Sequence, residues 1–71
     1  MTEEQDKKLE EKMSRIGYPD FDILPGQDDI LMVFVNHSLV CGAEYALTIS
    51  DDELKSLVVG VVAAHAIQSN N

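Results

Sequence analysis

The chain has 71 residues, and 13 acidic side chains against five basic ones give it a formal net charge of −8. A surface this acidic repels nucleic-acid phosphates and anionic membranes, so we expect neither as a direct partner. Cys41 is the only cysteine, which excludes both an intramolecular disulfide and the paired-cysteine spacing of a structural zinc site.

A chain of this length forms a single domain, residues 1–71, because it has too few apolar residues for two cores. Such a domain buries only about 60% of its unfolded surface, so a partner subunit is a common source of further stability. The charged N-terminus does not resemble a signal peptide, and the apolar run at 57–67 is shorter than the about 20 residues that span a bilayer. Together with one unpaired thiol, this predicts a cytoplasmic protein without a membrane anchor.

Residues 1–16 are predicted to form a charged helix. Thr2 is a suitable N-cap, acidic residues fill the first turn, and Lys12 and Arg15 lie near the end, which suits the helix macrodipole. Gly17 stands where a helix stop is expected. A narrow apolar stripe along one side is expected to contact the rest of the domain: Leu9, Met13 and Ile16.

Residues 17–29 are predicted to be a linker. Pro19 and Pro25 fix the backbone there and exclude helix at the residues that precede them. The segment is nevertheless too apolar for a free loop, so we expect it to lie as a clasp over one edge of the core. The apolar side chains of this clasp are Tyr18, Phe21, Ile23 and Leu24.

Residues 30–49 are predicted to form a two-stranded β-hairpin. The six consecutive apolar residues at 30–35 are typical of a strand that is covered on both faces. Residues 36–38 form a turn signal, and the alternation over 39–49 indicates a second strand. A helix over 29–47 is the alternative, because short apolar runs fit either structure. The predicted fold class is therefore α+β, with an all-α three-helix bundle as the alternative.

Residues 50–68 are predicted to form a capped apolar helix, followed by a polar tail at 69–71. Ser50 and Glu53 fit a capping box, in which the Ser50 hydroxyl accepts from the Glu53 amide and the Glu53 carboxylate returns a bond. From Leu57 onward the helix is apolar on nearly every side, so it needs to be covered on every side.

We expect this last helix to associate with a second copy of the chain, as a homodimer or a higher oligomer, most simply across a twofold axis. One hairpin and one narrowly apolar helix offer too little surface to cover it. Two alternatives remain open: the linker and the first helix bury it in a monomer, or a different protein docks on it. The residues predicted for self-association are Leu57, Gly60, Val61, Ala63, Ala64 and Ile67.

The chain offers few candidates for catalysis or metal binding. His37 and Cys41 come together only if their segment is helical; otherwise His37 lies in a solvated turn, and we expect Cys41 and His65 to be core residues. The linker aspartates do not match the ligand spacing of an EF-hand. The chain has no phosphate-binding glycine loop and no catalytic serine motif. The sequence therefore predicts no catalytic residue, no metal site, no cofactor and no enzymatic activity.

The predicted function is that of a small self-associating regulator or inhibitor that binds another protein through an acidic surface. A basic, nucleic-acid-binding protein is the partner that such a surface favours. An alternative is an oligomer that sequesters a nucleotide or metabolite at its subunit interfaces. An enzyme that uses Cys41 with His37 or His65 is a third hypothesis. The residues predicted to contact the basic partner are Asp20, Asp22, Asp28, Asp29 and Glu44.

Overall fold

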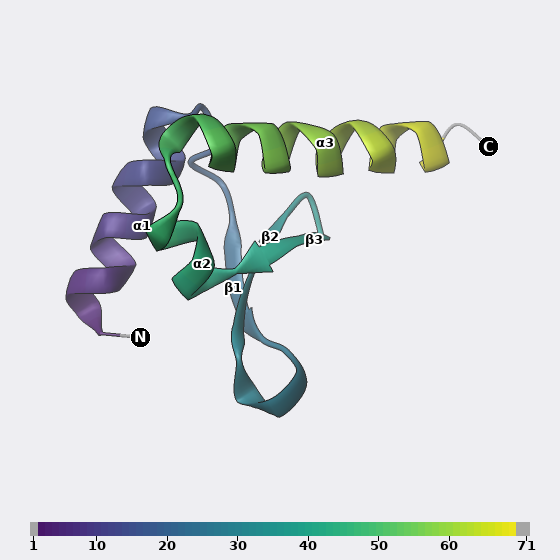
Figure 1. Cartoon of the computed structure of the whole chain (residues 1–71). Helices are drawn as coiled ribbons and strands as arrows, with labels where there is room; N and C mark the ends of the chain where they lie inside the picture. Colours follow the sequence, from purple (N-terminus) through teal and green to yellow (C-terminus); the bar gives the residue numbers. More distant parts are fainter. Residues whose placement is uncertain (1, 70–71) are drawn as a thin grey trace.

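The computed structural model describes residues 2–69 of the chain, and the side chains of residues 2–67 (Figure 1). The fold is α+β as predicted, and the all-α alternative is wrong. Residues 70 and 71 of the predicted tail lie outside the described residues. The elements in chain order are α1 (Glu3–Arg15), β1 (Asp22–Pro25), the short 3₁₀ turn η1 (Gln27–Asp29), β2 (Leu31–Val35), β3 (Ser38–Gly42), α2 (Ala43–Thr48) and α3 (Asp51–Ser69).

The observed sheet differs from the predicted two-stranded hairpin in two ways. It has three antiparallel strands in the order β1-β2-β3, because part of the predicted linker forms β1 and pairs with β2. Strand β3 ends at Gly42, and the following residues form α2 instead of continuing the strand. Ala43, Ala46 and Leu47 are three and four positions apart, so the same apolar residues that alternate along the sequence also fit one side of a helix.

Two turns connect the strands. Asn36 and His37 form the turn between β2 and β3 with φ of 53° and 65°, and positive φ at both central residues is the signature of a type I′ hairpin turn. The N–H of Gly26 donates to the carbonyl oxygen of Ile30 at 2.7 Å and closes the loop between β1 and β2. A Cβ atom on Gly26 would lie 2.8 Å from the Met32 side chain, so glycine is needed for Met32 to pack against this loop.

The hydrophobic core lies between one face of the sheet, referred to here as the inner face, and the three helices. The predicted stripe of α1 is confirmed, because all three of its residues are buried. Most of the predicted clasp also packs against the core, but Leu24 lies outside it and is half-exposed. The buried apolar residues are Leu9, Met13, Ile16, Val33, Val35, Ala43, Ala46, Leu54 and Val58.

Both long helices begin at the predicted caps. Thr2 and Gln5 form a complete capping box on α1: the Gln5 N–H donates to Thr2 Oγ1 at 3.2 Å, and the Thr2 N–H donates to Gln5 Oε1 at 3.0 Å. On α3 the Ser50 hydroxyl accepts from the Glu53 N–H at 3.1 Å, which is one half of the predicted box. These bonds satisfy N–H groups that have no partner within the helix.

Helix α1 stops at Gly17, as predicted. The Tyr18 N–H donates to the Met13 carbonyl oxygen at 2.9 Å, and the Gly17 N–H donates to the Ser14 carbonyl oxygen at 3.1 Å. This pair of bonds is the Schellman motif, which requires a left-handed residue at the position of Gly17, where φ is 93°.

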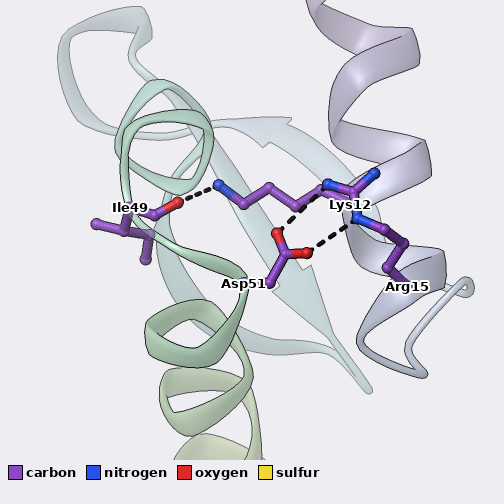
Figure 2. Close-up of polar contacts among 4 residues, drawn as sticks. All are labelled: Lys12, Arg15, Ile49 and Asp51. Atoms are coloured by element: carbon purple, nitrogen blue, oxygen red, sulfur yellow. Dashed lines mark hydrogen bonds and ion pairs between the residues drawn. The ribbon is translucent and has the colours of Figure 1, made fainter.

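Two basic residues of α1 join it to the junction between α2 and α3 (Figure 2). The buried Lys12 donates from Nζ to the carbonyl oxygen of Ile49, at the C-terminal end of α2. Arg15 forms a two-pronged ion pair with Asp51, with Nε 2.9 Å from Oδ2 and Nη2 3.3 Å from Oδ1. The hydrogen bond from Arg15 lowers the pKa of Asp51 below its ordinary value. These contacts fix the start of α3 against the end of α1.

Candidate interaction surfaces

Helix α3 has two halves with different surroundings. In the proximal half, residues 51–58, Leu54 and Val58 are fully buried in the core. In the distal half, residues 59–67, Val61 and Val62 are partly buried and the other residues are exposed, with Ile67 66% exposed. Figure 1 shows this half of α3 extending beyond the sheet. An apolar helix surface is therefore left open to water.

Most of the residues predicted for self-association lie on this open surface. Gly60, Ala63, Ala64 and Ile67 are exposed, Leu57 is 37% exposed, and Val61 is partly buried. A Cβ atom on Gly60 would meet no atom of the described residues within 4 Å. Packing within the described chain therefore gives no reason for a glycine in the middle of this helix.

The second open apolar surface is the outer face of the sheet, the face away from the helices. Val33 and Val35 point into the core, so the alternate residues of β2 point outward. Leu24 of β1 pairs with Met32 and is 50% exposed. Leu39 of β3 pairs with Phe34 and is 51% exposed. Within the described chain, β2 is therefore fully buried on one face only, and Met32 and Phe34 on the other face are partly buried, whereas the sequence predicts cover on both. The outer sheet face consists of Leu24, Met32, Phe34 and Leu39, with Asp22 at its corner.

The five acidic residues predicted to bind a partner do not form one patch. Asp20 and Asp22 line a hollow of about 270 Å³ near the turn between β2 and β3. Asp29 and Glu44 line a separate hollow of about 500 Å³ at the other end of the sheet, where α2 begins. Asp28 adjoins Asp29 in η1. A flat partner surface would therefore meet these residues in two groups.

A third acidic hollow lies between α1 and β1 and has a volume of about 590 Å³. Asp6 and Glu10, one turn apart on α1, form one wall, and Asp22 of β1 joins them from the other side. Phe21 and Ile23 add apolar surface. The acidic spacing on α1 is visible in the sequence, but its position opposite β1 is not, because β1 itself is not predicted.

The structure separates the candidate nucleophile from the candidate base. Cys41 lies on the inner face of the sheet opposite Val33, and burial raises the pKa of its thiol above the ordinary value, which favours the protonated, less nucleophilic form. His37 lies in the exposed turn and lines a hollow with Asp20 and Asp22. His65 is exposed, so its prediction as a core residue is wrong. Among the described residues, no three His, Cys, Asp or Glu side chains are grouped so as to hold a metal ion.

In comparisons with protein-family models, curated proteins and solved structures, none matches this chain. The helices within residues 2–69 are too short or too polar for any of them to cross a membrane.

Proposed function

We propose that this chain is a protein-binding regulator or inhibitor that associates with a second copy through the distal half of α3. One observation carries the proposal: the distal half is apolar apart from His65, yet none of its side chains is fully buried. Burial against a partner removes that apolar surface from water and so stabilises the assembly. The proposal includes a cytoplasmic location, where the single thiol of Cys41 stays reduced.

Charge favours a second copy as the occupant of this surface. Two chains that each have a formal net charge of −8 repel one another over most of their surfaces. From residue 56 to residue 71, however, the sequence contains no Asp, Glu, Lys or Arg. The distal half of α3 is therefore a place where two copies meet without bringing like charges into contact.

The variant Ala64→Glu tests the role of the distal half. Glutamate is a good helix former, so the change adds a charge to the open surface and weakens α3 itself by less than about 1 kcal/mol. In sedimentation velocity we expect a dimer for the unmodified chain and a monomer of unchanged helix content for Ala64→Glu. The matched control is Ser14→Glu, which adds the same charge at an exposed position of α1 and should remain dimeric. Equal sedimentation of the unmodified chain and both variants would contradict the proposal.

The partner of this assembly is proposed to be a basic protein surface, such as one that otherwise contacts nucleic acid. From residue 17 onward the sequence contains eight acidic residues and one basic residue, Lys55. Exposed carboxylates line the three hollows, and each hollow also contains apolar side chains. Such a combination attracts a basic surface electrostatically and offers it apolar contacts as well.

Charge reversal in pairs tests where the basic partner binds. We would change Asp20 and Asp22 to lysine in one variant, and Asp29 and Glu44 to lysine in another. The control changes Glu3 and Glu4 of α1 to lysine, which alters the net charge equally. Fluorescence anisotropy with a labelled lysine- and arginine-rich peptide should show at least a tenfold loss of affinity for one hollow pair and a much smaller loss for the control. An equal loss for all three variants would mean general charge attraction and would remove the proposed docking surface.

A small-ligand binder is a second candidate, favoured by the hollow that Asp29 and Glu44 share with Ile30 and Tyr45. Its volume of about 500 Å³ lies in the range of ligand pockets. The two carboxylates favour a cationic metabolite over a nucleotide. Because a ligand that binds only the folded state raises the melting temperature, thermal-shift screening tests this candidate. A panel of polyamines, metabolites and nucleotides without any shift would count against it.

A further inference from the structure

Two apolar surfaces of the described chain are open, and they lie on different elements: the distal half of α3 and the outer sheet face. An antiparallel sheet with one face in water normally alternates apolar and polar residues along its strands. Strand β2 does not alternate, because Met32 and Phe34 on the outer face are as apolar as Val33 and Val35 on the inner face. Its composition is that of a strand covered on both sides.

Within the described part of the chain, the outer sheet face is covered only in part. The buried residues of α1, α2 and α3 all belong to the single core on the inner face. On the outer side, the loop at Gly26 lies against Met32, and Met32 and Phe34 are partly buried, but Leu24 and Leu39 stay half-exposed. The apolar surface that stays exposed here is therefore open to contact with another molecule.

We infer that the distal half of α3 packs across the outer sheet face of a second copy, and that the second copy does the same in return. A helix lying on the open face of an antiparallel sheet is one of the standard layered arrangements of proteins. A pair of α3 helices would leave both outer sheet faces open, and a pair of sheets would leave both distal halves open. The reciprocal arrangement covers all four surfaces with one twofold interface. The inference rests on the proposed self-association and names the surface that receives α3.

The position and length of the distal half of α3 fit this arrangement. The distal half extends beyond the sheet, so it contacts a neighbour without leaving its own core (Figure 1). Residues 59–67 form a helix about 14 Å long, and three strands about 4.8 Å apart are about 10 Å across from first to last, so the helix crosses the whole face. Small residues let the helix backbone approach the sheet closely, and nothing in the described chain contacts the position of a Cβ on Gly60.

Charge selects these same two surfaces as the contact between copies. The distal half contains no Asp, Glu, Lys or Arg, and the outer sheet face has only Asp22, at its corner. The η1 loop, by contrast, carries two carboxylates and no basic residue and would repel its counterpart. Helix α1 is charged along its length, with five acidic and four basic side chains that favour contact with water. Two acidic chains therefore approach with least repulsion when α3 of one meets the sheet of the other.

The first test places a lysine on the outer sheet face through Leu39→Lys. The matched control is Thr48→Lys, which adds the same charge at an exposed position of α2. We expect Leu39→Lys to raise the dimer dissociation constant about 100-fold, since loss of one buried leucine weakens binding about tenfold and the change enters each dimer twice. Thr48→Lys should change the dimer dissociation constant less than threefold in equilibrium sedimentation.

The outcomes separate this inference from the proposed function. If Ala64→Glu is monomeric while Leu39→Lys dimerises like the unmodified chain, α3 binds some other surface, and the inference is wrong while the proposed self-association stands. If the unmodified chain is monomeric, both are wrong. Circular dichroism and cooperative thermal unfolding show whether each variant folds. If Leu39→Lys does not fold, Leu24→Lys on β1 places the same charge on the same face.

A mixing experiment tests the reciprocal geometry directly. In a heterodimer of Leu39→Lys with Ala64→Glu, one contact joins an intact α3 to an intact sheet face. The other contact brings the new lysine and the new glutamate together. We expect the mixture to dimerise at least tenfold more tightly than either variant alone. A mixture with no gain in affinity would overturn the reciprocal arrangement, because a pair of α3 helices gives no such rescue.

Discussion

The proximal and distal halves of α3 differ in both composition and surroundings. The proximal half is mostly polar and its buried apolar residues face the core, whereas the distal half is apolar apart from His65 and is largely exposed. The proximal half is capped by Ser50, tied to α1 through Asp51, and buried in the core at Leu54 and Val58. The distal half continues the same helix past the sheet with its apolar residues exposed. The proximal half is held by the chain's own packing, whereas the distal half has the composition of a buried helix without the burial. We take this difference as the sign of an intermolecular contact.

The largest expected effect is on the proximal half. Leu54→Ala removes a fully buried side chain and should lower the free energy of unfolding by about 2–5 kcal/mol. Leu57→Ala, at a partly exposed position on the same helix, should cost less than about 1 kcal/mol. Both are measured by urea unfolding in the Ala64→Glu background, so that assembly does not contribute. Equal losses at the two positions would contradict the assignment of the buried side of α3.

Lys12→Met should cause the next largest loss in the free energy of unfolding. It keeps the apolar stem of the side chain but removes the charged donor to the Ile49 carbonyl oxygen, a loss of about 1.5–3 kcal/mol. Lys8→Met, at an exposed position of the same helix, serves as the control and should be nearly neutral. If urea denaturation shows the same stability for both variants, the contact between Lys12 and the end of α2 does not hold the start of α3 in place.

Gly60→Ala should have opposite effects on the stability of the isolated chain and on the stability of the dimer. In the isolated chain alanine should stabilise α3 by about 1 kcal/mol, because a Cβ there meets no described atom. In the dimer the added methyl group should hinder close approach and raise the dissociation constant. Thermal unfolding in the Ala64→Glu background measures the first effect, and sedimentation of the single variant measures the second. An unchanged or tighter dimer would mean that Gly60 is not at the interface.

The smallest expected effect concerns pH. Because Arg15 lowers the pKa of Asp51 in the folded state, the ion pair adds stability above the ordinary carboxyl pKa, and this contribution is lost as the pH falls through the lower folded value. The free energy of unfolding, measured with urea, should therefore fall slightly less between pH 7 and pH 2 for Asp51→Asn than for the unmodified chain. Asp52→Asn, in the same turn, is the control. Identical pH profiles for the two variants would argue against the ion pair.

The sequence was sufficient for the features that depend on local patterns. The cap at Thr2, the stop at Gly17, the cap at Ser50 and the apolar surface of α3 all follow from residue types at fixed spacings. The fold class follows from the same reasoning, because most of the apolar run at 30–35 forms strand β2, between two helical patterns.

The features that depend on tertiary contacts were not predictable. Strand β1 is four residues long and ends in Pro25, which an edge strand tolerates because no partner needs its N–H. At α2, the alternating pattern and the helical pattern share the same residues. The sequence shows that both faces of β2 are apolar, but only packing determines which one the helices cover. Burial of Lys12 has no local signal at all, since it depends on the distant Ile49.

The central claim is that the distal half of α3 is covered by a second copy, and molar mass in solution tests it most directly. Light scattering behind size exclusion, at loading concentrations from micromolar to millimolar, should give twice the 7.9 kDa mass of the chain at the upper end, with dissociation on dilution. A mass of 7.9 kDa at every concentration would contradict the claim.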